Sequence, residues 1–197
     1  MKNEFSEEVK ILPWIGKNYK KSPKILVLGM ATYNQARDRR NVVKNMINSL
    51  CDGTWTNEKY FWTRTKNVLK EKNEETIDFW NRVSFYEYIQ GLVKPKKNIS
   101  EQNWENANEP FLEVLKVLKP DIIAVIGFLT FNRMKNRFKK GKNITKNGNT
   151  METLECNINK RSVYICKIKH TAAYGFKKDV WRELYFKFIK LWNSGGL

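Results

Sequence analysis

Residues 24–34 read Lys-Ile-Leu-Val-Leu-Gly-Met-Ala-Thr-Tyr-Asn, a short apolar run that ends at Gly29. Pro23 precedes the run and the glycine closes it, which is the pattern of a buried strand. Residues 162–168 repeat the arrangement, because Ser-Val-Tyr-Ile-Cys-Lys-Ile leads to His170, the one histidine of the chain. In an open parallel sheet both strands would end at the carboxyl edge, where ligands bind.

Further strands and helices alternate along the chain. Residues 121–127, Asp-Ile-Ile-Ala-Val-Ile-Gly, predict a buried central strand, and the aromatic and β-branched residues of 82–90 predict another. Helices are expected within 36–51, from 107 to Pro120, at 128–140 and at 178–192, with one or two short helices in 52–80, a basic turn at 94–98 and a polar loop at 141–149. This rhythm predicts an α/β fold, a three-layer α/β/α sandwich with a mostly parallel central sheet, in a single domain of residues 1–197.

The charge of the chain is strongly positive. It has 37 Lys and Arg against 20 Asp and Glu, a formal net charge of +17. Such an imbalance concentrates polyanions around a protein, so DNA is the leading partner, although a compositional bias towards Lys and Asn is the alternative explanation. The start lacks a secretory signal and the longest apolar run, 122–129, is too short to span a membrane, so we expect a soluble, cytoplasmic, monomeric protein.

Neither a metal nor a cofactor is expected. Cys51, Cys156 and Cys166 show no C-x-x-C spacing, and one histidine adds little to a ligand set. An odd number of cysteines in a reducing compartment argues for packing roles rather than disulfides. The sequence also lacks the glycine-rich patterns of dinucleotide-binding and P-loop proteins.

Three arginines open the helix expected within residues 36–51. Arg37, Arg39 and Arg40 would fall in its first turn, where the helix dipole favours anions rather than cations. A bound anion nearby would explain them. An α/β protein that binds a small anionic ligand through this cluster is therefore one of the functional hypotheses.

The order of these motifs resembles the uracil-DNA glycosylase superfamily over most of the chain. The resemblance is carried by Gly-Met-Ala-Thr-Tyr at 29–33, by Phe-Tyr-Glu-Tyr at 85–88, by the strand at 121–127 and by His-Thr-Ala at 170–172. In that family the first motif is Gly-x-(Asp/Asn/Glu)-Pro-(Tyr/Gly) and the last is His-Pro-Ser, so both are matched in part. The resemblance implies a three-layer glycosylase fold and hydrolytic removal of a uracil-type or modified base from DNA.

The same resemblance assigns a base pocket. Gly29, Met30 and Tyr33 would form it, with the tyrosine excluding bulkier bases, and Ala31 occupies the slot of the water-activating residue. A methyl group cannot position water, so Asn34 and Glu87 are the candidates to replace it. Glu87 lies where many relatives carry a base-reading asparagine; a carboxylate accepts hydrogen bonds only, so it would favour a base edge with donors or act as general base.

The resemblance gives His170 the role of stabilising the departing base anion. Removal of a base also requires its extrusion from the stack, and Tyr174 is a candidate wedge. Lys177 and Lys178 are candidates for phosphate contacts, as are Thr171 and Arg37. Phe61 and Phe85 are candidates to stack on the extruded base, with core packing as the alternative for both. A catalytically inactive DNA-binding module on the same scaffold is the further hypothesis, favoured by Ala31 and Thr171.

Overall fold

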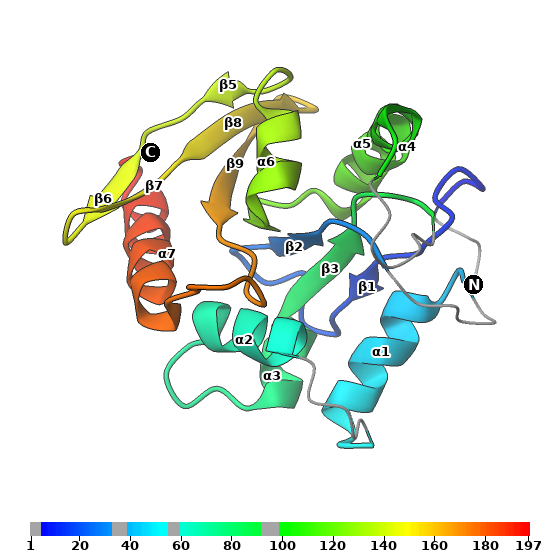
Figure 1. Cartoon of the computed structure of the whole chain (residues 1–197), viewed down its shortest axis with the longest axis horizontal. Coiled ribbons are helices and arrows are strands. Elements are labelled where there is room, and N and C mark those ends of the chain that lie inside the picture. Colours follow the sequence, from blue (N-terminus) through cyan, green and yellow to red (C-terminus); the bar gives the residue numbers. More distant parts are fainter. Residues whose placement is uncertain (1–4, 33–38, 55–59, 92–98) are drawn as a thin grey trace.

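A seven-stranded mixed sheet forms the centre of the protein in the computed structural model, which describes residues 5–32, 39–54, 60–91 and 99–197. Its strand order is β1-β3-β2-β4-β9-β8-β5 (Figure 1). The strands are β1 (Trp14–Ile15), β2 (Ile25–Gly29), β3 (Val83–Glu87), β4 (Ile122–Ile126), β5 (Lys139–Lys140), β8 (Thr153–Ile158) and β9 (Arg161–Ile168). β3, β2, β4 and β9 are parallel neighbours, while β1 and β8 pair antiparallel with β3 and β9. The α/β class and the central position of β4 are thus as predicted.

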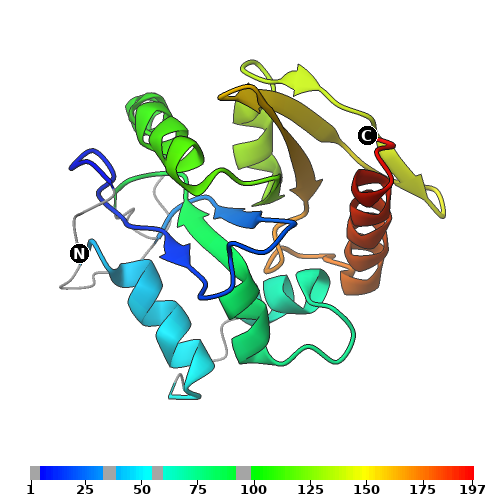
Figure 2. The same cartoon turned by 180° about the vertical axis from the view of Figure 1, so that it is seen from behind.

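The parallel strands are apolar because helices cover both faces of the sheet. Every residue of β2, β3 and β4 is buried, which explains why β2 and β4 appear in the sequence as continuous apolar runs; β3 also buries the polar residues Ser84 and Glu87. One core packs against α1 (Val42–Cys51), α2 (Tyr60–Leu69), α3 (Thr76–Arg82) and α7 (Lys178–Asn193). The other core packs against α4 (Glu101–Asn106), α5 (Asn108–Leu118) and α6 (Phe128–Met134), and Figure 2 shows the same arrangement from behind.

Two predicted helices have different limits in the structure. α1 begins at Val42, so Arg39 and Arg40 precede the helix instead of lying in its first turn, and Asn41 is its N-cap residue. α6 ends at Met134, where the helix predicted for 128–140 gives way to turns and to β5. Met134 is the last buried residue of this helix; the next three residues, Lys135, Asn136 and Arg137, are polar and exposed.

The predicted polar loop at 141–149 is wrong, because a second sheet lies there. β6 (Ile144–Lys146) and β7 (Asn149–Met151) form an antiparallel hairpin in which Ile144 faces Met151. Both of these side chains are buried against α7, and the turn residues Asn147 and Gly148 have positive φ angles. An Asn-Gly pair is the preferred hairpin turn, so this signal was present in the sequence.

The predicted limits of β9 and α7 agree with the structure to within a residue or two. β8 was not predicted. Among the described residues, no helix combines the length and the apolar character needed to cross a bilayer.

Candidate functional site

Four parallel strands end at one edge of the sheet. Gly29 at the end of β2 is the register partner of Glu87 at the end of β3. On the neighbouring strands, the N–H of Gly127, which follows β4, donates to the carbonyl of Ile168 at 2.8 Å, two residues before His170. The two strand ends that the sequence singled out therefore lie at the same edge.

Gly29 leaves no room for a side chain. A Cβ atom at this position would overlap Oε2 of Glu87 and would lie 2.9 Å from Cζ of Phe85. Glycine is thus required by close approach rather than by a special φ angle. As a result the Glu87 carboxyl lies directly over the end of β2.

Aromatic rings connect this carboxyl to the imidazole. The Phe61 ring of α2 lies 6.2 Å from that of Phe85 and 5.2 Å from that of His170, measured between centroids. Phe85 is fully buried, so it supports the wall of the site and has no face free for a base, whereas Phe61 is half-buried. A Cβ atom on Gly127 would lie 3.8 Å from Cδ2 of the imidazole, so His170 is placed between α2 and the end of β4.

Glu87 is a buried carboxyl without a full set of partners. It is 5% exposed, and burial raises its pKa to about 8. The nearby Thr32 hydroxyl lowers the pKa in part, yet Oε2 of Glu87 and Oγ1 of Thr32 have no hydrogen-bond partner of normal geometry among the described residues. Burial therefore favours the protonated form of the carboxyl, which offers one donor and one acceptor where a carboxylate offers acceptors alone.

His170 is neutral at the same pH. Its ring is half-buried, and desolvation lowers its pKa below the ordinary value. The N–H of Ala172 donates to Nδ1 at 3.3 Å, so the ring proton of the neutral imidazole lies on Nε2. This arrangement turns His170 into a hydrogen-bond donor that acts through Nε2.

The loop between β9 and α7 is held in shape by its own hydrogen bonds. The N–H of Ala173 donates to the carbonyl of His170 at 2.9 Å, and Nζ of Lys169 donates to the carbonyl of Gly175 at 3.1 Å. Gly175 has a φ of +66°, a conformation that favours glycine. The turn leaves Tyr174 fully exposed at its tip, where a wedge would have to lie.

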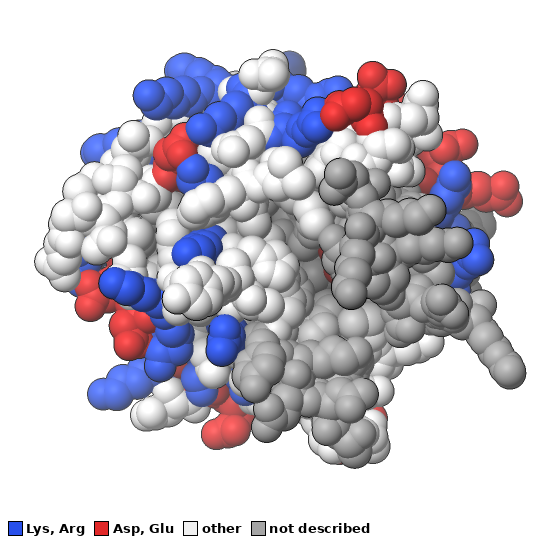
Figure 3. All heavy atoms as spheres, viewed as in Figure 1, with Lys and Arg blue, Asp and Glu red and all other residues white. Residues whose placement is uncertain are grey.

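The two lysines predicted to contact phosphates are exposed after this turn. Lys177 and Lys178 lie at the start of α7, and Lys178 makes one exposed ion pair with Asp179 at 3.4 Å. An exposed pair of this kind is weak and leaves the ammonium available to other anions. In the space-filling view of Figure 3, blue Lys and Arg atoms surround the part of the surface that the β9–α7 loop occupies in Figure 1.

Thr171 does not lie at the predicted DNA surface. Its side chain is fully buried, and its hydroxyl bonds to the Thr65 hydroxyl at 3.0 Å and to the Phe61 carbonyl at 3.1 Å. Nη1 of Arg64 also donates to its carbonyl at 3.2 Å. These bonds attach the histidine loop to α2, so Thr171 positions His170 instead of contacting phosphate.

The turn after β2 is described in part. Ala31 is buried and Met30 is half-buried, both against the core that contains Tyr86 and Phe111. The main chain of the turn continues the pairing with β3, since the Gly29 carbonyl accepts from the N–H of Tyr88 at 3.1 Å. The predicted site residues Tyr33, Asn34 and Arg37 lie outside the described residues.

The arginine cluster gains little support as an anion site. Arg40 donates through Nη1 to the Val9 carbonyl at 3.1 Å and through Nη2 to the Ser6 carbonyl at 3.5 Å. These bonds hold the N-terminal segment against the start of α1. Arg39 is exposed.

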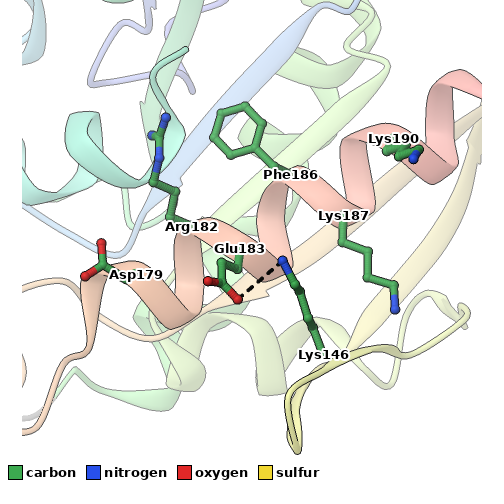
Figure 4. Close-up of a pocket in the computed structure, with 7 residues that line it drawn as sticks. All are labelled: Lys146, Asp179, Arg182, Glu183, Phe186, Lys187 and Lys190. Atoms are coloured by element: carbon green, nitrogen blue, oxygen red, sulfur yellow. Dashed lines mark ion pairs between the residues drawn. The ribbon is translucent and has the colours of Figure 1, made fainter. Parts of the chain in front are cut away.

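An open groove of about 800 Å³ lies between β6 and α7 (Figure 4). Two of its lysines have partners within the fold: Lys146 pairs with Glu183 at 3.4 Å, and Lys187 donates to the Thr145 carbonyl at 2.6 Å. Arg182 extends out of the groove to the carbonyls at the end of α2, including that of Lys70 at 2.6 Å. These three side chains therefore stabilise the contacts of α7 with β6 and α2.

Two residues of the site were not fully recognised from the sequence. Thr32, whose hydroxyl lies near the Glu87 carboxyl, was not named, and Phe61, whose ring lies between those of Phe85 and His170, was named only as a candidate for stacking or core packing. Thr32 is a buried polar residue in the turn after β2, and its polarity next to an apolar strand was the available signal. Among the described residues, no three His, Cys, Asp or Glu side chains are grouped as ligands of a metal would be. No model of a known protein family matches the sequence, and no curated protein matches it either.

Proposed function

We propose that this protein is a DNA N-glycosylase-like hydrolase that extrudes a uracil-type or modified base from DNA and removes it with water. The proposal is carried by one observation: an imidazole whose Nδ1 accepts a main-chain hydrogen bond lies at the same sheet edge as a buried carboxyl whose Oε2 has no hydrogen-bond partner among the described residues, with Phe61 and Phe85 between them. The net charge of +17 supports a polyanionic substrate.

In the proposed reaction the bond between the sugar C1′ and the base nitrogen breaks, and its electron pair leaves with the base. His170 donates from Nε2 to the oxygen on which negative charge develops. A donor placed in advance of the reaction in a partly dry site is worth roughly 3 to 4 kcal/mol. The oxygen of water then bonds to C1′ and the water loses its proton to solvent. Ala31 cannot position this water, so Asn34, whose amide oxygen can accept a hydrogen bond from it, is the candidate to hold it.

Glu87 recognises the base in this proposal. As a neutral acid it offers one O–H donor and one carbonyl acceptor, as an asparagine amide does. That pair complements an imide edge, in which an N–H lies beside a carbonyl oxygen, as in uracil and its 5-substituted relatives. Because the two oxygens of a neutral carboxyl can exchange roles, Glu87 fits the imide edge of a uracil-type base and also an edge that presents an amino group beside a ring nitrogen, as in cytosine.

A catalytically inactive DNA-binding module is the second candidate. It is favoured by Ala31, whose buried methyl group occupies the slot where the resembled family places its water-activating residue. Such a module would bind DNA in a salt-sensitive manner and would release no base.

The test is release of base from oligonucleotides that contain uracil, 5-substituted uracils or cytosine, read as alkali-labile strand breaks under single-turnover conditions. We expect His170→Ala to slow release by about 10²-fold or more. The matched control Ile77→Ala removes an exposed side chain of α3 and should leave the rate unchanged. If the wild-type protein binds DNA but releases none of these bases, the inactive module is the correct reading.

A second variant tests the role of Glu87. Glutamine also offers one donor and one acceptor, so Glu87→Gln should retain base release at pH 7 and should keep it above pH 8, where the wild-type carboxyl ionises. Complete loss of activity in Glu87→Gln at every pH would instead assign general-base chemistry to the carboxylate.

A further inference from the structure

Exposed large hydrophobic side chains are concentrated at the carboxyl edge of the sheet. Among the described residues, five are exposed: Ile15, Ile77, Phe128, Leu129 and Tyr174. The last three belong to the two segments that follow β4 and β9, and they are 39%, 52% and 101% exposed. Clustered apolar surface of this kind marks an interaction site more often than scattered single residues do.

The two segments are in contact with each other. Gly127, directly before Phe128, is hydrogen-bonded to the end of β9 and lies next to the His170 ring. The Phe128 ring makes an edge contact with the half-buried Trp181 ring in the first turn of α7, at 5.7 Å between centroids. We call Phe128, Leu129, Tyr174 and Trp181 the apolar patch.

Cationic side chains border the apolar patch. The ammonium of Lys167 lies 4.6 Å from the centroid of the Phe128 ring, but it is largely buried and ion-paired with Glu152. Nζ of Lys169 donates to the Gly175 carbonyl in the loop that carries Tyr174. Lys177 and Lys178 are exposed between the loop and α7. Figure 3 shows this mixture as uncharged surface interrupted by blue atoms on the face that holds the β9–α7 loop.

We propose that the apolar patch binds unpaired nucleotides next to the base being removed, so that single-stranded DNA is the preferred form of the substrate. A single strand offers base faces to apolar and aromatic side chains and phosphates to lysines at the same time, whereas a duplex hides its base faces. The patch combines these two kinds of side chain within two adjoining segments. The link to base removal rests on the function proposed above, while the binding itself does not.

The test compares three fluorescent probes of equal length by anisotropy at one salt concentration: oligothymidine, a strand of abasic sugar-phosphate units, and the thymidine–adenine duplex. All three carry phosphates, but the first alone exposes base faces. We expect oligothymidine to bind about tenfold more tightly than the abasic strand. Leu129→Ala and Tyr174→Ala should each reduce this ratio by about threefold or more.

The matched control is Ile77→Ala. Ile77 is the second residue of a seven-residue helix and is 48% exposed, as Leu129 is the second residue of α6 and is 52% exposed. The control should leave the ratio between the two strands unchanged. Equal binding of oligothymidine and the abasic strand would overturn the proposal, and so would a change in sedimentation in the patch variants that shows the patch to be a contact between copies of the chain.

The outcomes separate the two proposals. Base release that depends on His170, together with equal binding of the two single strands, would retain the proposed function and remove the patch. Stronger binding of oligothymidine that depends on Leu129 and Tyr174, without any base release, would retain the patch and remove the glycosylase reaction.

Discussion

Replacing Glu87 by glutamine changes how the stability of the protein depends on pH. The folded-state pKa of this carboxyl is about 8, above the value of 4.5 for an unburied glutamate. Below pH 4.5 the carboxyl is protonated in both states and has no effect on folding. Between pH 4.5 and 8 the unfolded chain releases the proton while the folded chain keeps it, so stability falls as pH rises.

The size of the effect follows from the two pKa values. One pKa unit corresponds to about 1.36 kcal/mol, and integrating between pH 5 and pH 8.5 gives a loss of about 4 kcal/mol in the free energy of unfolding. Glutamine does not titrate, so the Glu87→Gln protein lacks this loss. The difference in stability between variant and wild type should therefore grow by about 4 kcal/mol over that range, whatever constant offset the amide adds.

Urea unfolding followed by tryptophan fluorescence measures this difference at pH 5, 7 and 8.5. The contributions of other titratable groups to the free energy of unfolding cancel in this difference, because both proteins contain those groups. A difference that stays constant to within about 1 kcal/mol would show that Glu87 ionises normally in the folded protein, and the neutral-acid role in base recognition would then be refuted.

Three further variants have defined outcomes. Thr171→Val removes the hydroxyl that bonds to α2 and should lower the free energy of unfolding by about 1 to 2 kcal/mol, measured in urea; an unchanged stability would contradict the attachment of the loop. Lys177→Ala with Lys178→Ala should reduce the slope of log K against log salt for single-stranded DNA by roughly 1.4, and an unchanged slope would remove both phosphate contacts. Arg182→Ala should speed amide hydrogen exchange in the last turn of α2, because its guanidinium bonds to the carbonyls there; equal protection would show that solvent replaces it.

Strands with a continuous apolar sequence were predictable because both of their faces are covered. β2, β4 and β9 agree with the expected ranges, since apolar runs bounded by proline, glycine or a polar turn have few other interpretations. β8 was missed because Glu155 and Asn157 alternate with buried residues beside a polar hairpin. β8 pairs with β9 as a hairpin whose two turn residues, Asn159 and Lys160, both have positive φ angles, so the missed strand lies directly before the predicted one.

The sequence predicted where the candidate site lies, but not the environment of its polar side chains. Strand ends placed Gly29, Glu87 and His170 at one edge, which the topology confirms. The raised pKa of Glu87 could not be predicted, because it follows from burial by residues distant in sequence. The burial of Thr171 was equally hidden, since it depends on the packing of α2 against the loop.

Gln90 joins the N-terminal segment to the strand that carries Glu87. Its side-chain oxygen accepts from the N–H of Ile11 at 3.0 Å, and its amide donates to the main-chain carbonyl of Glu87 at 2.7 Å. This buried amide acts as a mechanical coupling between two parts of the chain that are distant in sequence. Displacement of the N-terminal segment would therefore shift the main chain of Glu87. The side-chain amide signals of isotope-labelled Gln90 would change when either of these two hydrogen bonds is broken.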